Sequence, residues 1–109
     1  MLNSDLIMLN LDEKYIKMIK EILSEHISTT LVWAYGSRVK NHSHQGSDLD
    51  LVIFPGADVK PETISTLREV FTDSELPILV DILDWNTIPD SFKQEINKEH
   101  FVLQNPKMF

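Results

Sequence analysis

Residues 31–54 read LVWAYGSRVKNHSHQGSDLDLVIF, and this stretch decides the fold. Leu31 to Tyr35 form a short apolar run that stops at Gly36, as expected for a buried strand. Asp48 to Phe54 form a second run, which is apolar after its two aspartates and ends at Pro55-Gly56. The residues between the two runs are polar. The stretch therefore predicts two strands joined by a loop.

Helices and a third strand are predicted around these two strands. The patterns predict a helix over residues 12–27 with Asp12 as N-cap, and a short helix or turn over 37–43. A further helix is predicted to begin at Pro61, and Pro77 prevents it from continuing. A strand over 78–83 and a last helix from about Pro89 to His100 follow. Thr87 and Asp90 resemble a capping box before that last helix. The alternation of elements predicts an α/β fold, in which a small mixed sheet is flanked by helices. A length of 109 residues suits one domain over 1–109.

Composition excludes several functional classes. The chain has no cysteine, so it holds no disulfide and no thiolate metal site. A net charge of −7 disfavours direct binding of nucleic acid, because an acidic surface repels the phosphate backbone. No apolar run approaches the ~18 residues that span a bilayer, and the N-terminal residues, with Asp5 and no basic region, make a poor signal peptide. We therefore expect a cytoplasmic protein without a membrane contact.

Two aspartates at the start of the second strand are the strongest sign of chemistry. Side chains two apart on a strand point to one side, so Asp48 and Asp50 project together, while Leu49, Leu51 and Ile53 face the other way. Two carboxylates held ~4 Å apart at an effective dielectric of about 20 repel by roughly 4 kcal/mol. A hard divalent cation such as Mg²⁺ relieves this repulsion and prefers oxygen ligands.

A third aspartate stands in the middle of the third predicted strand. Asp81 interrupts the apolar run Ile78 to Leu83, which gains nothing from an unpaired charge. If the two strands are neighbours, Asp81 completes a three-carboxylate site with Asp48 and Asp50. We interpret the nearby Asp84 as a cap or a solvated acid at the strand end.

The other end of the motif has the features of a phosphate-binding turn. Gly36 has no Cβ, so a phosphate can approach the main chain closely. Ser37 supplies a hydroxyl and an N–H group, and Arg38 supplies a positive charge. We therefore expect Gly36, Ser37 and Arg38 to bind a nucleotide, and the turn and carboxylates together have the parts needed for phosphoryl transfer.

These residues resemble the nucleotidyltransferase superfamily that includes DNA polymerase β. The pattern is Gly36-Ser37, then ten residues, then Asp48-x-Asp50, and then a later strand aspartate, Asp81. The short chain is most similar to the minimal nucleotidyltransferase (MNT) proteins, which serve as antitoxins beside helical HEPN-domain toxins. The resemblance covers roughly residues 12 to 103, but Lys40-Asn41 stand where many relatives have Arg-Gly.

The resemblance implies a function and its partners. It implies two Mg²⁺ ions, with Mn²⁺ as an alternative, held by Asp48, Asp50 and Asp81 as catalytic and metal-binding residues. It implies ATP as donor, and AMP transfer onto a tyrosine of a HEPN-domain toxin in a hetero-oligomer. Two alternatives stay open, namely a catalytically weak antitoxin that acts by binding alone and a transferase for an aminoglycoside-like small molecule.

The remaining features of the sequence have simpler interpretations. His42 and His44 are interpreted as part of a solvated loop, since no further zinc ligands follow. Trp33, Tyr35 and Trp85 are interpreted as aromatic residues of the core or its rim. The apolar tail of residues 100–109 either contacts a partner protein or folds back on its own sheet, and the sequence does not separate these two.

Overall fold

The computed structural model describes residues 8–40 and 46–106. Its elements, in chain order, are α1 (Glu13–Ile27), β1 (Leu31–Tyr35), β2 (Leu49–Phe54), α2 (Pro61–Asp73), β3 (Val80–Asp84), the 3₁₀ helix η2 (Trp85–Thr87), α3 (Asp90–Lys98) and β4 (Phe101–Gln104). The four strands form one sheet in the order β3-β2-β1-β4. β1 is antiparallel to β2 and β4, whereas β2 and β3 are parallel, so the sheet is mixed as predicted.

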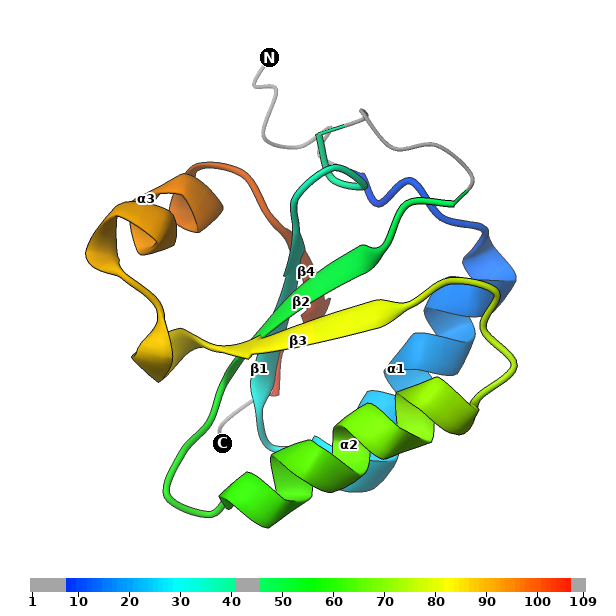
Figure 1. Ribbon diagram of the computed structural model, residues 1–109, viewed down its shortest axis with the longest axis horizontal. Helices are drawn as coiled ribbons and strands as arrows, with labels where there is room; N and C mark the ends of the chain where they lie inside the picture. The colour runs from blue at the N-terminus through cyan, green and yellow to red at the C-terminus, as the bar shows by residue number, and fades with distance from the viewer. Residues whose placement is uncertain (1–7, 41–45, 107–109) are drawn as a thin grey trace.

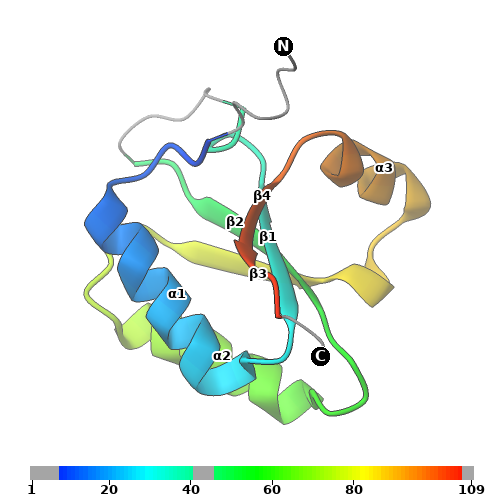
Figure 2. The same cartoon turned by 180° about the vertical axis from the view of Figure 1, so that it is seen from behind.

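Helices cover the two faces of the sheet unequally. α1 and α2 lie side by side on one face, and α3 lies on the other (Figures 1 and 2). α2 also connects the parallel strands β2 and β3, which a hairpin cannot join. Because one helix covers less of a sheet than two, the face under α3 has room for a site.

The side chains of β2 alternate between these two faces, as predicted. Leu49, Leu51 and Ile53 are fully buried in the large core that the sheet shares with α1 and α2. Val52 faces the other way and packs with Tyr35 in a smaller cluster beside α3. Asp50 shares the side of Val52, because residues two apart on a strand point alike.

Local sequence signals explain where the first two long helices begin and end. The carboxylate of Asp12 accepts a hydrogen bond from the Lys14 N–H at 3.1 Å, so the predicted N-cap is confirmed. Pro61 occupies the first turn of α2, where its missing N–H has no cost. α2 ends at Asp73, before Pro77.

Several predicted boundaries are wrong by one or two residues. β2 begins at Leu49 rather than at Asp48, β3 begins two residues and ends one residue later than predicted, and α3 is shorter at both ends. Strand and helix ends depend on hydrogen bonds that periodicity does not reveal. Residues 36–40 form a turn in which the Val39 and Lys40 N–H groups donate to the Gly36 carbonyl, and residues 41–43 lie outside the described residues.

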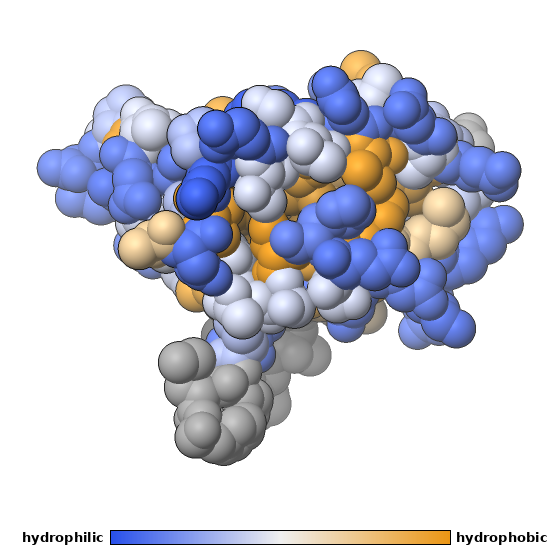
Figure 3. Space-filling model, turned by 90° about the horizontal axis from the view of Figure 1, so that it is seen from below, coloured by the Kyte–Doolittle hydropathy of each residue, from blue (hydrophilic) through white to orange (hydrophobic). Residues whose placement is uncertain are grey.

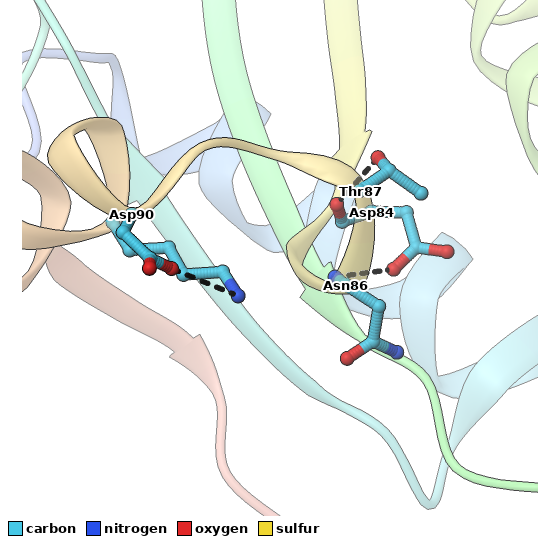
Figure 4. A network of polar contacts seen from close by, with 5 residues as sticks. Asp84, Asn86, Thr87 and Asp90 are labelled. Carbon is cyan, nitrogen blue, oxygen red and sulfur yellow. Dashed lines mark hydrogen bonds and ion pairs between the residues drawn. The ribbon is translucent and has the colours of Figure 1, made fainter.

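The predicted capping box at Thr87 and Asp90 is wrong. The Thr87 hydroxyl donates to the Asp84 carbonyl at 2.9 Å, and the Asp84 carboxylate accepts from the Asn86 N–H at 2.8 Å (Figure 4). These bonds close the short helix η2, so Thr87 is not available to cap α3. Asp84 is thus a cap, as interpreted from the sequence, and α3 starts after Pro89 without a side-chain cap.

The strand β4, which the sequence did not predict, shows where most of the apolar tail goes. Phe101, Val102 and Gln104 pair with β1, and Leu103 is buried in the core. The side-chain amide of Gln104 donates to the carbonyls of Ile27 and Thr30, both at 2.7 Å. The tail therefore folds back on its own sheet, which was one of the two alternatives. No helix within residues 8–40 and 46–106 is long and apolar enough to cross a membrane.

Candidate active site

Three polar side chains form a row across three neighbouring strands at one end of the sheet. In the strand register Tyr35 on β1 stands opposite Asp50 on β2, and Asp50 stands beside Asp81 on β3. Cross-strand partners lie on the same face, so all three lie on the face under α3. The sequence placed Asp50 and Asp81 on separate strands, and the parallel pairing of β2 with β3 brings them together.

Electrostatics shows that all three predicted aspartates lie near one another. Burial, followed by the charges of Asp81 and Asp48, raises the pKa of the half-buried Asp50 carboxyl. Asp48 lies just before β2 and is exposed, as is Asp81. The site is thus one half-buried carboxylate in the field of two exposed ones.

The hydroxyl of Tyr35 also lies in the electric field of the aspartate carboxylates. Its side chain is buried, and burial together with the charges of Asp50 and Asp81 raises the pKa of its hydroxyl. The hydroxyl therefore keeps its proton at neutral pH. Sequence analysis assigned Tyr35 to the core or its rim, and it does contact Phe92 of α3 edge to face, with ring centroids 5.6 Å apart.

Gly36 brings the main chain against Asp50. Its φ angle is 84°, in the left-handed region that favours glycine. A Cβ at this position would lie 2.6 Å from Oδ2 of Asp50, closer than real contacts allow. Ser37 follows in the turn and is partly exposed. The predicted phosphate-binding residues Gly36 and Ser37 thus adjoin the carboxylates.

Arg38 is buried, whereas Gly36 and Ser37, the other residues predicted to contact the nucleotide, are partly exposed. Its side chain is only 6% exposed, and its guanidinium donates to the Ser47 carbonyl from Nε and NH2 and to the Asn10 carbonyl from NH1. The Asn10 N–H in turn donates to the Arg38 carbonyl at 2.8 Å. These bonds tie the segment before α1 to Ser47, the neighbour of Asp48.

The carboxylates suit a hard divalent cation, although they do not form a complete cage. Within residues 8–40 and 46–106, no three acidic or histidine side chains converge closely enough to hold an ion. The three-carboxylate site is therefore not preformed, and mutual repulsion gives a physical reason. Asp50 and Asp81 in register still match Mg²⁺, which takes one or two carboxylates together with substrate phosphates.

A small cavity opens beside this row. It has a volume of about 110 Å³ and is lined by Tyr35, Gly36, Lys40, Phe92, Glu95, Ile96 and Glu99. The sequence did not indicate that Phe92, Glu95 and Ile96 of α3, and Glu99 just after it, line this cavity, because nothing near the Gly36 motif points to a helix so much later in the chain. The spacing of Phe92, Glu95 and Ile96 by three and four residues is the available signal that these three share a helix face. His42 and His44 lie outside the described residues.

Comparison with known protein families and structures gives consistent results. Residues 17–107 match the family model described as "Polymerase beta, Nucleotidyltransferase". A protein of Haemophilus influenzae named "Probable protein adenylyltransferase MntA" is 36% identical over 96 residues, which cover 88% of this chain and 84% of the relative.

Solved structures share the fold at low sequence identity. A crystal structure of a toxin–antitoxin with AMP-PNP superposes with a TM-score of 0.68 at 20% identity, covering 83% of this chain and 73% of the other. A mutant of the toxin–antitoxin MntA-HpeT superposes with a TM-score of 0.66 at 19% identity, covering 87% and 74%. At such identities the likeness establishes the fold alone.

Proposed function

Because the chain belongs to the polymerase beta nucleotidyltransferase family, we propose that it transfers AMP from ATP to a hydroxyl group of a partner protein. The observation that carries this proposal is the pairing of Asp50 with Asp81 on adjacent strands, against the main chain of Gly36. Acidic ligands for a cation and a turn open to phosphate are the parts that phosphoryl transfer requires.

Each predicted residue receives a role in this reaction. Asp48, Asp50 and Asp81 would hold the metal ions, and Asp81 would also help to remove the proton of the acceptor hydroxyl. When bound, the ions, Mg²⁺ or Mn²⁺, stabilise the charge on the attacking and leaving oxygens. Gly36 and Ser37 hold the triphosphate, and pyrophosphate leaves when the acceptor oxygen bonds to the α-phosphorus.

In this proposal Arg38 fixes the position of Ser47 in the site, and its contact with the nucleotide stays a prediction. Its guanidinium holds the Ser47 carbonyl with two donors at 3.1 and 2.9 Å, directly before Asp48. Two donors on one carbonyl restrict where the following aspartate lies.

The proposed partner is a helical HEPN-type toxin that presents a tyrosine hydroxyl. The support is the name of the Haemophilus relative, a protein adenylyltransferase, and the likeness in fold to toxin–antitoxin structures, one with the ATP analogue AMP-PNP. An acceptor must be held close to the α-phosphate, and a docked protein can hold its hydroxyl there. Apolar groups gather between charged ones on one side of the molecule (Figure 3), as on a surface that docks a protein. We place this complex in the cytoplasm.

Labelled ATP tests the reaction directly. The purified chain is incubated with Mg²⁺, the partner protein, and ATP labelled on either the α- or the γ-phosphate. Label from the α-phosphate alone should enter the partner, and Asp50→Asn or Asp81→Asn should abolish this. Asp73→Asn, at the exposed end of α2, is the matched control. Label from the γ-phosphate, or full transfer by Asp50→Asn, would refute the proposal.

A further inference from the structure

One edge of the sheet is left open by the fold. β4 is the last strand in the order β3-β2-β1-β4, and among residues 8–40 and 46–106 no strand pairs with its outer side. Figure 2 shows β4 on the near side of the sheet, with α1 beside it. The main-chain N–H and C=O groups that point outward from β4 are therefore available to another strand.

The two edges of the sheet differ in how they are protected against pairing. At the opposite edge, β3 carries the charges of Asp81 and Asp84. The Arg68 guanidinium also donates to the Ile82 carbonyl of β3 at 3.0 Å. Edge charges and occupied carbonyls discourage a further strand. β4 has the sequence Phe-Val-Leu-Gln, with no charge and no proline, so it lacks these protections.

Apolar side chains reach the β4 edge on both faces of the sheet. On the face of α1, Phe101 and Leu103 line an open groove of about 770 Å³. On the other face, Val102 is 43% exposed beside Trp33, its partner on β1. A strand added to β4 would place its alternate side chains against these two surfaces. The added strand therefore needs apolar side chains at successive positions, as β4 itself has.

The sequence of β4 fits a second copy of the same strand. Directly opposite side chains of antiparallel strands lie on one face, so a two-fold axis at Val102 pairs each Phe101 with Leu103 of the other copy. Every cross-strand pair is then apolar. A shift of one residue would oppose side chains of different faces, and a shift of two would pair Val102 with Gln104 or His100. The register centred on Val102 is therefore the most apolar one.

The charges along the groove also suit a second copy. Its wall on α1 has two lysines and two glutamates, all exposed, which are Lys17, Lys20, Glu13 and Glu21. This wall is neutral although the whole chain has a net charge of −7. Two copies can therefore approach each other here without the repulsion that their net charges cause elsewhere.

The direction of α1 brings opposite charges together in such a pair. Gln104, the last residue of β4, donates to the Ile27 carbonyl at the end of α1, so α1 and β4 run in the same direction (Figure 2). A two-fold axis at Val102 then makes the two α1 helices antiparallel. Lys17 and Glu21 lie on either side of the middle of the groove wall, so Lys17 of each copy lies beside Glu21 of the other.

From these observations we propose that two copies of this chain associate through β4, antiparallel about a two-fold axis at Val102, so that their two sheets become one. Such an isologous contact uses the same surface on both copies. The row of Tyr35, Asp50 and Asp81 lies on the three other strands, so the contact uses none of its residues. The association is therefore independent of nucleotide, metal ion and AMP transfer.

A disulfide tests the pairing and its register together. The chain has no cysteine, so Val102→Cys introduces a single thiol. In the proposed dimer the two thiols lie directly opposite, with Cα atoms about 4.5–5.5 Å apart, which a disulfide can span. Mild oxidation with diamide should convert most of this variant to a disulfide-linked dimer. Leu79→Cys, the matched control, is more exposed at 69% but should stay largely monomeric in the same oxidation.

Sedimentation of the full chain, without nucleotide or partner, measures the association itself. We expect a dimer at micromolar concentration. Val102→Lys should raise its dissociation constant by roughly tenfold or more, because like charges would lie directly opposite, whereas Leu79→Lys should not. Lys17→Glu and Glu21→Lys should each weaken the dimer, and the two together in one chain should restore it, since the pair of charges is only exchanged.

Thermal melting of each variant shows that it is folded. An unmodified chain that sediments as a monomer up to its limit of solubility, or a dimer that Val102→Lys leaves unchanged, would overturn the proposal. Equal disulfide formation by Val102→Cys and Leu79→Cys would overturn the register. If the chain is monomeric and Val102→Lys instead weakens binding of a toxin-type partner, the edge accepts a strand of that partner, and the second copy is excluded.

Discussion

At the scale of single residues, the site depends on the close approach of Gly36 to Asp50. Gly36→Ala adds a Cβ 2.6 Å from Oδ2 of Asp50 and places alanine at a positive φ. The backbone strain alone is of order 1–3 kcal/mol, and the carboxylate must move. We expect lower stability in urea unfolding, and a loss of transfer that exceeds what the remaining folded fraction accounts for.

The matched control for this substitution is Gly56→Ala. Its Cβ would approach Oδ1 of Asp58 at 3.1 Å, and Gly56 has no positive φ. Gly56 lies beyond the far end of β2, so transfer should persist. Equal loss of transfer in both variants would show that Gly36 has no special role at the site.

The charge of Asp50 leads to a prediction about stability and pH. Burial and the charges of Asp81 and Asp48 raise its pKa above the ordinary 3.8. The folded protein therefore holds this proton more tightly than the unfolded chain does. The contribution of this tighter proton binding to the free energy of unfolding is fully present below about pH 3.8. It is lost as the pH rises through the raised pKa.

Asp50→Asn removes this loss of folding stability at neutral pH, because the amide carries no charge. At neutral pH the variant should melt at a higher temperature than the unmodified protein, and the two melting temperatures should converge as the pH falls toward 4. Added Mg²⁺ should raise the melting temperature of the unmodified protein more than that of the variant. A lower melting temperature for the variant at neutral pH would assign Asp50 a stabilising role instead.

The main-chain hydrogen bonds of Arg38 could not be predicted from the sequence. A positive charge beside Gly36-Ser37 predicts a phosphate contact, which stays a prediction, and the structure adds hydrogen bonds from Arg38 to the carbonyls of Asn10 and Ser47. Every residue has a main-chain carbonyl, so the sequence does not show which carbonyls accept these bonds. Asp48, Asp50 and Asp81 could be predicted because carboxylates in apolar strands conflict with their surroundings.

At the scale of elements, β4 closes one edge of the sheet with few residues. Leu103 is 4% exposed in the core, whereas Val102 on the same strand is 43% exposed. Leu103→Ala should therefore cost about 2–4 kcal/mol in the free energy of unfolding. Val102→Ala, the matched control, should cost much less, and chemical denaturation measures both. Similar losses would mean that β4 does not pack as described.

Elements with a continuous apolar run or a helical stripe of apolar residues could be predicted from the sequence, whereas β4 could not. β1 and β2 are such runs, and the stripes of α1 and α2 have helical spacing. β4 is four residues long and follows a helix closely, so it is too short to show a recognisable alternation of apolar and polar residues. Its place also depends on Gln104, whose amide reaches carbonyls more than 70 residues earlier in the chain.

At the scale of the whole molecule, the order of elements was enough to predict a mixed α/β sheet but not its register. The pairing of Asp50 with Asp81 results from the parallel crossover through α2. The contribution of α3 to the cavity results from the way α3 folds over the open face (Figure 1). Both are long-range arrangements, so the sequence grouped Asp81 with Asp48 and Asp50 only on the condition that their strands are neighbours, and it did not place Glu95 and Glu99 at the cavity.

The central claim is that this chain modifies a protein partner with AMP. Mass spectrometry of the toxin-type partner, purified after co-expression with this chain, tests it most directly. We predict a mass increase of one or more AMP units on a tyrosine-containing peptide, and its absence when the Asp48→Asn, Asp50→Asn double variant is co-expressed. An unmodified partner that is nevertheless bound and neutralised by the unmodified chain would contradict the claim.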